Sequence, residues 1–388
     1  MTLAPPGALD GIVVADFSRV LAGPYATMLL ADLGADVIKV ERPGVGDDTR
    51  AWGPPWRDDQ ATYFLSVNRN KRSVTVDLRD PAGLLAARTL ARRADVLVEN
   101  FKPGAFDAMG LGYDDLRVDN PGLVYASITG FGTAGGADLP GYDLLVQAVG
   151  GLMSITGSRP DEPVKVGVAL VDVVTGLHAA VGILAALQHR EKTGQGQRVQ
   201  VNLLSSLLSA LVNQSSAYAA AGSVPGIMGN RHPSIAPYES YPTADKPFVI
   251  AIGNDGQFRK AMEVLGRREL ADDERFATNP QRVAHRDALH ELMCTRLRTR
   301  GADDWFAALS AVGVPCGPIN DVAGAFDLAA RLGLAPIAEA DGIPTVANPL
   351  TLSETPPSYR RPPPRLGEGT DDVLAELGLT DGGSGVTT

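Results

Sequence analysis

The amino-acid sequence predicts an α/β protein built from parallel strand–helix units. Short β-branched runs alternate with helical patterns over the first half of the chain, as βαβ units do. A segment also recurs, because GADVIKVE (34–41) resembles RADVLVE (93–99). In parallel sheets ligands bind beyond the carboxyl ends of the strands. We therefore expect a ligand at the loops that start at Glu41, Asp77 and Glu99.

Hydrophobic periodicity predicts the individual elements. Runs rich in Val and Ile predict strands at residues 12–17, 36–40, 74–78, 95–98 and 123–128. Apolar residues at helical spacing predict helices at residues 24–33, 81–93, 172–190 and 203–221. The glycines of KTGQGQ (192–197) indicate a turn after the helix that begins at Asp172.

Shifts in composition predict the domain organisation. Residues 1–221 form a large domain, and residues 222–241, rich in Gly, Pro and Ser, form the best linker candidate. A strand at residues 248–252 followed by charged helices predicts a small domain at residues 242–325. Residues 326–388 are expected to return to the large domain, with a disordered tail from residue 381.

Charge and cysteine content exclude several classes of protein. The 35 basic and 45 acidic residues give a net charge of −10, which disfavours nucleic-acid binding and requires a local basic pocket for any polyanionic ligand. Cys294 and Cys316 lack CxxC spacing, so neither a disulfide framework nor a zinc site is expected. The apolar stretch 177–187 is broken by His178 and Gly182 and is judged too short to span a bilayer. With no recognisable signal peptide, a cytoplasmic protein is expected.

Asp172 is the first candidate for chemistry. It follows the apolar run VKVGVALV (164–171) at the start of a predicted helix. One interpretation is a helix N-cap, a role that Asp favours and that is far commoner than nucleophilic catalysis. The other is a carboxylate nucleophile at the positive end of a helix, with nearby glycines that leave room for a substrate. Both can hold together, but spacing alone favours the N-cap.

The segment GFGTAG (130–135) matches the GxGxxG pattern of dinucleotide sites and follows a predicted strand. No helix opens after it, because ADLPG (137–141) follows at once, and the strand is not the first of the sheet. The required strand–turn–helix context is missing, so a flexible loop is favoured over a nicotinamide site.

Basic residues gather near the predicted strand ends. A solvated surface is the usual place for such side chains. Their position beyond strand ends of an acidic protein instead favours a phosphate-bearing ligand. The residues are Arg42, Arg50, Arg69, Lys71, Arg72, Arg79 and Lys102.

Six motifs occur in chain order: LDGIVVADFSRVLAGP (9–24), DLGADVIKVER (32–42), NRNKR (68–72), VENF (98–101), KTGQG (192–196) and GVPCGP (313–318). Together they resemble the family III CoA-transferases of the CaiB/BaiF type, which include formyl-CoA:oxalate and carnitine CoA-transferases. Three further segments look most like the succinyl-CoA:glutarate or hydroxymethylglutarate type, namely AWGPP (51–55), LSVNRN (65–70) and LLSS (203–206).

The resemblance implies a fold, a nucleophile and a substrate. The family has a Rossmann-like large domain and a smaller α+β domain, and its two chains form an interlocked-ring homodimer. Coenzyme A or acyl-CoA and a carboxylic acid are the implied substrates, with no metal, nucleotide cofactor, nucleic acid or membrane involved. Asp172 matches the aspartate nucleophile. CoA contacts are implied at Val20, Leu21, Arg42, Val76, Asp77, Leu78, Arg79, Asn100, Phe101, Lys102, Tyr142 and Asp143.

The implied activity is transfer of CoA from a donor acyl-CoA to a carboxylic acid, a small dicarboxylate, through mixed anhydrides and an aspartyl-CoA thioester. One alternative is a 2-methylacyl-CoA racemase of the same fold. That enzyme needs the His of a Gly-His-Asp triplet, whereas this chain has Tyr142 there, and a phenol is a poor replacement for imidazole in moving a proton at neutral pH. A catalytically silent CoA-binding protein is the alternative of another class.

Three positions depart from the pattern of the family. The formyl-CoA enzyme has Gln where this chain has Leu21 and a basic residue where it has Ala108, which disfavours oxalate as the acceptor. Gly369 stands where the family often has His.

Overall fold

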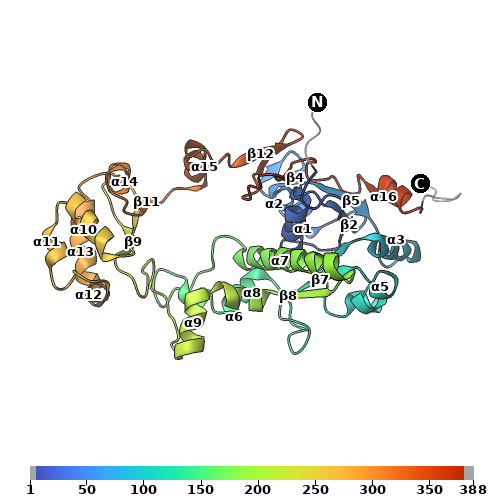
Figure 1. Ribbon diagram of the computed structural model, residues 1–388, viewed down its shortest axis with the longest axis horizontal. Helices are drawn as coiled ribbons and strands as arrows, with labels where there is room; N and C mark the ends of the chain where they lie inside the picture. The colour runs from blue at the N-terminus through green and yellow to red at the C-terminus, as the bar shows by residue number, and fades with distance from the viewer. Residues whose placement is uncertain (1–5, 380–388) are drawn as a thin grey trace. The chain divides into compact units, whose positions relative to one another are not determined.

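A computed structural model describes residues 6–379 of the chain, and Figure 1 shows its elements. Contacts divide the chain into two compact units. Unit 1 contains the residues up to Leu152, Val166–Ser223 and the residues from Ala335, and unit 2 contains Met153–Lys165 and Val224–Leu334. The sequence-based division into domains with a linker at 222–241 stays a prediction. The tail from residue 381 lies outside the described residues.

Unit 1 is built on a six-stranded sheet in the order β5-β2-β1-β6-β7-β8, with every neighbouring pair parallel. This confirms the mixed α/β class with a parallel sheet. When these six strands are renumbered 1 to 6 in the order in which they occur in the sequence, their order across the sheet is 3-2-1-4-5-6. Dinucleotide-binding folds have the same strand order. The strands are β1 (Val13–Asp16), β2 (Asp36–Glu41), β5 (Lys71–Thr75), β6 (Val96–Glu99), β7 (Val124–Thr129) and β8 (Arg198–Asn202).

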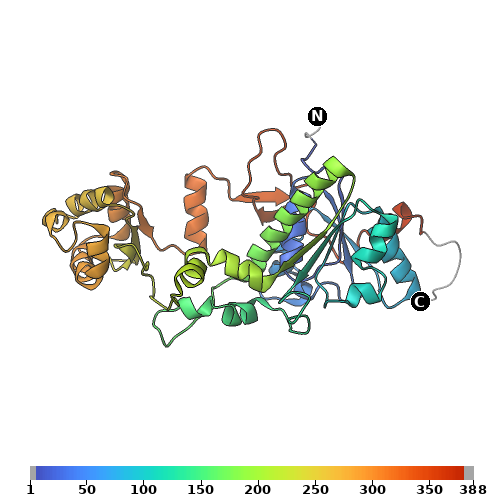
Figure 2. The same ribbon diagram turned by 60° about the horizontal axis from the view of Figure 1, so that its bottom comes forward.

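Helices cover both faces of this sheet, as Figures 1 and 2 show. On one face α1 (Ala22–Asp32) lies against α7 (Leu170–Thr193), and Gly176 permits the close approach, because a Cβ there would come within 2.6 Å of the Ala22 carbonyl oxygen. On the other face an apolar core joins the sheet to α3 (Pro81–Arg93), α4 (Ala105–Ala108), α5 (Tyr113–Asp119) and α16 (Thr370–Glu376).

Shorter elements complete unit 1. They are η1 (Asp48–Ala51), the hairpin β3 (Trp56–Arg57) and β4 (Gln60–Ala61), α2 (Thr62–Val67), α6 (Asp143–Val149), α8 (Leu203–Ala210), α9 (Val212–Ala221), and the antiparallel pair β12 (Ile337–Ala340) and β13 (Ile343–Val346).

The structure corrects two predicted elements and adds a strand. Strand β5 begins at Lys71 instead of residue 74, because Lys71 and Ser73 face a buried polar cluster. Strand β8 was not expected. The single helix predicted at 203–221 is two helices, α8 and α9, which meet at Val212 with a φ of 41°.

Helix α7 also corrects the argument about membranes. It has 24 residues, so by length and composition it could cross a bilayer, and the statement that its apolar stretch is too short was wrong. One such helix is weak evidence, since the core helix of a water-soluble fold passes the same test. Ala179, Ile183 and Ala186 on α7 are fully buried within the chain.

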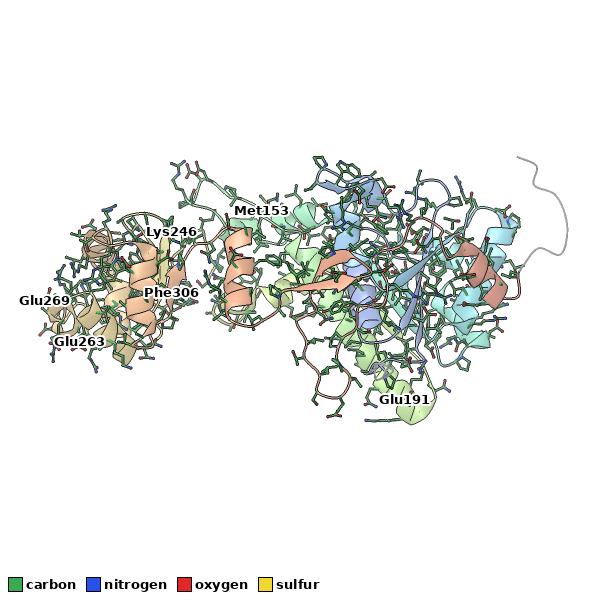
Figure 3. The ribbon with its side chains drawn as sticks, turned by 90° about the horizontal axis from the view of Figure 1, so that it is seen from above. Met153, Glu191, Lys246, Glu263, Glu269 and Phe306 are labelled. Atoms are coloured by element: carbon green, nitrogen blue, oxygen red, sulfur yellow. The ribbon has the colours of Figure 1, made fainter. Side chains whose placement is uncertain are left out.

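Unit 2 combines a three-stranded antiparallel sheet with helices around its own core. The core includes Phe248, Phe258 and Trp305, while Glu263 and Glu269 are exposed on the helical surface (Figure 3). Its elements are η2 (Met153–Ile155), β9 (Tyr238–Tyr241), β10 (Phe248–Ala251), α10 (Asp255–Val264), α11 (Glu269–Asp272), α12 (Asn279–Ala284), α13 (Arg286–Leu297), α14 (Ala302–Ser310), β11 (Cys316–Pro318) and α15 (Val322–Arg331).

Candidate active site

Asp172 lies in the first turn of α7 but does not cap this helix. The N-cap residue is Ala169, whose side chain makes no capping hydrogen bond. Asp143, the first residue of α6, supplies the cap: its Oδ1 accepts hydrogen bonds from the backbone N–H groups of Val171 at 2.8 Å and Asp172 at 3.2 Å. The N-cap interpretation of Asp172 is therefore wrong, and its carboxylate is not used to hold the helix end.

Burial and a neighbouring charge weaken Asp172 as an acid. Burial disfavours its ionised form, the Asp143 charge adds to this effect, and together they raise the pKa of Asp172 to about 7. Tyr63 on α2 also has a raised pKa. Burial is the main cause, the negative charges of Asp172 and Asp143 add to it, and the pKa of the phenol rises to about 12. At neutral pH the site therefore holds a partly ionised carboxylate near a protonated phenol.

A cavity of about 400 Å³ opens beside Asp172. The loops after β1, β6 and β7 form its walls, and the first turn of α7 contributes Asp172. The structure thus brings Asp172 together with half of the residues at which CoA contacts are expected. These are Val20, Leu21, Asn100, Phe101, Lys102 and Tyr142.

The cavity lies where the strand order of the sheet reverses, between β1 and β6. The loops after these two strands are tied together by Asn100, whose Nδ2 donates to the Arg19 carbonyl at 2.8 Å and whose Oδ1 accepts from the Arg19 N–H at 3.0 Å. Open parallel sheets bind their ligands at such a switch point. The amide of Asn100 fixes the spacing of the two loops there.

A second cavity, of about 450 Å³, opens beyond the ends of β2 and β5. Arg19 and Phe101 line both cavities, and the Arg19 guanidinium lies 5.3 Å from the centre of the Phe101 ring. The other expected CoA contacts in its wall are Arg42, Val76, Asp77, Leu78 and Arg79. Asp143 lines neither cavity, so its predicted contact with CoA stays a prediction beside the capping role described above.

The profile of CoA-transferase family III matches residues 9–370. The chain belongs to this family. The succinate–glutarate CoA-transferase of Agrobacterium fabrum is 47% identical and the alignment covers 96% of each chain. The human succinyl-CoA:glutarate CoA-transferase is 42% identical over 95% of this chain and 86% of its own. The acetyl-CoA:oxalate CoA-transferase of Acetobacter aceti is 40% identical over 94% of each.

Solved structures agree with this assignment. The crystal structure of a CaiB/BaiF family protein from Brucella suis is 44% identical, covers 96% of this chain and all of its own, and superposes with a TM-score of 0.87. The protein is thus a CoA-transferase, and acyl-CoA thioesters are its substrates.

Four of the transferase's seven basic residues near the strand ends serve the fold instead of a ligand. Arg50 pairs with Glu41, Arg69 with Asp32, Lys71 with Asp16 and Arg72 with Asp36, in contacts of 2.6–3.1 Å. Parallel strands usually bury apolar residues on both faces, so a sequence pattern places such charges at the surface. The side chains of Arg42, Arg79 and Lys102 remain largely exposed at the cavities.

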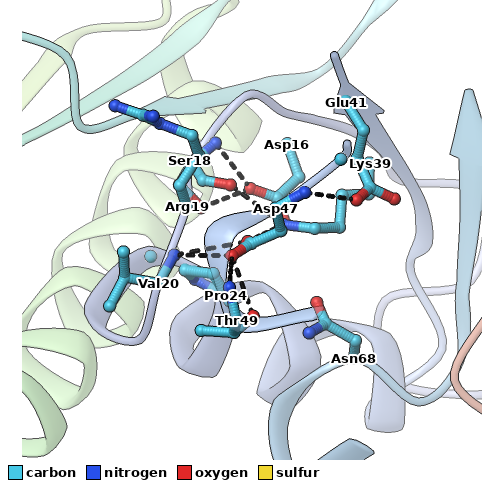
Figure 4. Close-up of polar contacts among 12 residues, drawn as sticks. Asp16, Ser18, Arg19, Val20, Pro24, Lys39, Glu41, Asp47, Thr49 and Asn68 are labelled. Atoms are coloured by element: carbon cyan, nitrogen blue, oxygen red, sulfur yellow. Dashed lines mark hydrogen bonds and ion pairs between the residues drawn. The ribbon is translucent and has the colours of Figure 1, made fainter. Parts of the chain in front are cut away.

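A buried polar network shapes the loop after β1 in the transferase (Figure 4). Asp47 accepts hydrogen bonds from Lys39 Nζ at 2.8 Å and from the backbone N–H of Val20 at 3.3 Å. Burial opposes the Asp47 charge, but Lys39 and the contacts with Thr49 outweigh it and lower the pKa of Asp47 to about 2.

Val20 is held in a conformation that its side chain disfavours. Its φ is 70°, the left-handed region, which is unusual for a β-branched residue. Asp47 and Lys39 were not predicted from the sequence as partners of this loop. The available signal was Lys39 within the apolar run of β2, at a position that a parallel strand normally buries.

The loop with the GxGxxG pattern forms part of the cavity wall in the transferase. Gly130, Gly132 and Gly136 line the cavity, and no helix begins before α6. Gly130 and Gly141 close the neck of the loop, because a Cβ on Gly130 would lie 2.5 Å from the Gly141 Cα. The glycines thus permit a close approach of two backbone segments.

Proposed function

We propose that this CoA-transferase moves CoA from a donor acyl-CoA to a small dicarboxylic acid, with Asp172 as the nucleophile. The observation that carries the proposal is the half-buried Asp172 carboxylate, with its raised pKa, in the wall of the cavity at the switch point. The glutarate and oxalate named for relatives of 40–47% identity support a small dicarboxylate.

The reaction proceeds by exchange of one thioester for another. The Asp172 carboxylate attacks the carbonyl carbon of the donor thioester. The C–S bond breaks, CoA departs as a thiolate, and the acyl group remains on Asp172 as a mixed anhydride. The thiolate attacks the aspartyl carbonyl and releases the donor acid, which leaves an aspartyl-CoA thioester. The acceptor carboxylate reverses both steps and departs as its CoA ester. Each half-reaction is a nucleophilic acyl substitution, so the ionised form of Asp172 is required.

The two cavities suit the two ends of an acyl-CoA. The thioester end belongs in the first cavity, beside Asp172, and the nucleotide end belongs in the second. Arg42 and Arg79 line the second cavity, and we assign them to the phosphates of CoA. Their partners Asp48 and Asp77 have side chains that are 39% and 37% exposed, so a phosphate can replace these weak surface pairs.

Arg19 is the cation that we assign to an anionic group of the substrate. Its Nε is buried and has no hydrogen-bond partner among the described residues, although its Nη1 contacts Asp48 at 3.2 Å. An unpaired buried donor is costly, and a carboxylate or phosphate of the substrate would satisfy it.

We also infer that the protein is a cytoplasmic homodimer of the interlocked kind that the resemblance implies. An apolar stripe on α7 supports a partner chain, because Leu177, Val181 and Leu184 are 42%, 64% and 37% exposed. These residues recur at helical spacing and form one face of the helix.

The proposed function predicts transfer without exchange of the α-proton. With succinyl-CoA as donor and glutarate as acceptor, chromatography should show a new acyl-CoA. In heavy water a 2-methylacyl-CoA should take up no deuterium at its α-carbon. Rapid deuterium uptake without transfer would make the protein a racemase with another base in place of histidine. Tight CoA binding with neither signal would instead indicate a silent binding protein.

A further inference from the structure

Gln147 on α6 is fully buried, and its side chain contacts Asp143 on the same helix and the segment that leads into α7. Its Nε2 donates to Asp143 Oδ2 at 2.5 Å and more weakly to the Val168 carbonyl at 3.5 Å. Its Oε1 accepts from the Val166 N–H at 2.9 Å. Because residues 143 and 147 are four apart on one helix, both side chains project from the same face.

The two side chains act on one target. Asp143 Oδ1 receives the N–H groups of Val171 and Asp172, and Asp143 Oδ2 receives the Gln147 amide. Gln147 in turn holds the backbone at Val166. Hydrogen bonds from one face of α6 therefore fix the chain on both sides of the point where α7 begins.

We propose that Asp143 and Gln147 are a positioning pair that aims the Asp172 carboxylate and keeps a negative charge beside it. The inference rests on the proposed role of Asp172 as the nucleophile. Asp143 satisfies the helix N–H groups that would otherwise compete for the Asp172 carboxylate. Gln147 holds Asp143 in that place. The nearby charge makes Asp172 more basic and hence a stronger nucleophile when ionised.

The charged and titratable groups around Asp172 single out Asp143. Tyr63 on α2 keeps its proton at neutral pH, and Tyr25 on α1 packs one turn farther along, against Gly176. The other charges that line the cavity are paired with each other, Arg19 with Asp48 and Lys102 with Asp138. Asp143 is therefore the neighbouring carboxylate whose charge raises the pKa of Asp172.

The polarity of the contacts permits an exchange of functional groups. The backbone N–H of Val166 donates to the side chain of residue 147, so the atom that it contacts must be an oxygen. The amide NH₂ of Gln147 must therefore point to Asp143. In Asp143→Asn two amide NH₂ groups face each other, and in Gln147→Glu two carboxylates do. The double variant Asp143→Asn/Gln147→Glu restores an NH₂-to-carboxylate contact, keeps the oxygen that caps α7, and gives up only the weak contact with Val168.

The test is a double-mutant cycle on the full-length transferase, with kcat, KM for acyl-CoA, the pH profile and the melting temperature of each variant. Each single variant should lower kcat about 10- to 100-fold, with KM changed less than about threefold. The double variant should recover kcat to within about fivefold of the wild type. The acidic limb of the kcat/KM profile should move to lower pH in Asp143→Asn, because the charge beside Asp172 is lost, and to higher pH in Gln147→Glu.

Wild-type kcat and pH profile in Asp143→Asn would overturn the inference, and so would a double variant no better than the worse single one. If a single variant does not fold, the double variant still tests the inference, because a positioning pair requires the double variant to recover its activity. Asp172→Asn is assayed beside them. Transfer by that variant would refute the nucleophile itself, whereas an inactive Asp172→Asn with wild-type pair variants would refute only the positioning pair.

Discussion

Asp172→Asn is expected to lower kcat by at least about 10⁴-fold, because it removes the nucleophile while keeping the size of the side chain. Affinity for acyl-CoA should change less than about threefold, since the cations assigned to CoA lie elsewhere in the two cavities. Steady-state transfer and calorimetric CoA binding measure the two effects. An Asp172→Asn variant with normal turnover would show that the carboxylate is not required.

The same variant should be more stable than the wild type at pH 8. The pKa of Asp172 is raised from 3.8 to about 7 in the folded protein, so between these values the folded state binds more protons than the unfolded state, and stability falls as pH rises. The full cost, present above pH 7, is at most about 4 kcal/mol. The stabilisation by Asn should therefore be seen at pH 8 and vanish near pH 4.

Asp32→Ala is expected to destabilise unit 1 by about 3–5 kcal/mol, because it leaves a buried guanidinium without its partner. Asp32 accepts two hydrogen bonds from Arg69, at 2.9 and 2.6 Å, and one each from Asn70 and Asn348 at 2.9 Å. Both side chains of the Asp32–Arg69 pair are at most 3% exposed. Asp32 thus joins α1 to the chain segment that returns to unit 1.

Asp36→Ala is the matched control. Asp36 binds Arg72 through two similar contacts, at 3.1 and 2.6 Å, but its side chain is 42% exposed and Arg72 also contacts Glu376. Its loss should cost about 1 kcal/mol or less. Urea unfolding followed by circular dichroism compares the two variants. Equal losses would show that burial does not set the value of these pairs.

Much of the parallel sheet could be predicted because β1, β2, β6 and β7 are short, mostly apolar runs that contain β-branched residues. Strand β5 was placed late because it opens with three polar residues, and β8 was missed because it alternates polar with apolar residues. On β5 Lys71 and Ser73 are buried, and Lys71 forms an ion pair with Asp16. Periodicity does not distinguish a charge buried in an ion pair from one at the surface.

The candidate nucleophile could be found from sequence, but its surroundings could not. Asp172 was identified from its motif and its place at a helix start. Its cap comes from Asp143, 29 residues earlier, through a contact that only the fold creates. The sequence does not indicate a role for Gln147, because a glutamine on a short helix is usually a surface residue. Only the structure shows that this side chain is buried.

The most direct test of the account is to incubate the transferase with a donor acyl-CoA alone. The first half-reaction needs no acceptor, so a covalent intermediate should accumulate on Asp172. After trapping with hydroxylamine or borohydride and digestion with trypsin, mass spectrometry should find the modification in the peptide of residues 166–190, and Asp172→Asn should show none. An unmodified peptide from wild-type enzyme under conditions of turnover would contradict the covalent mechanism and favour a single-step exchange in a ternary complex.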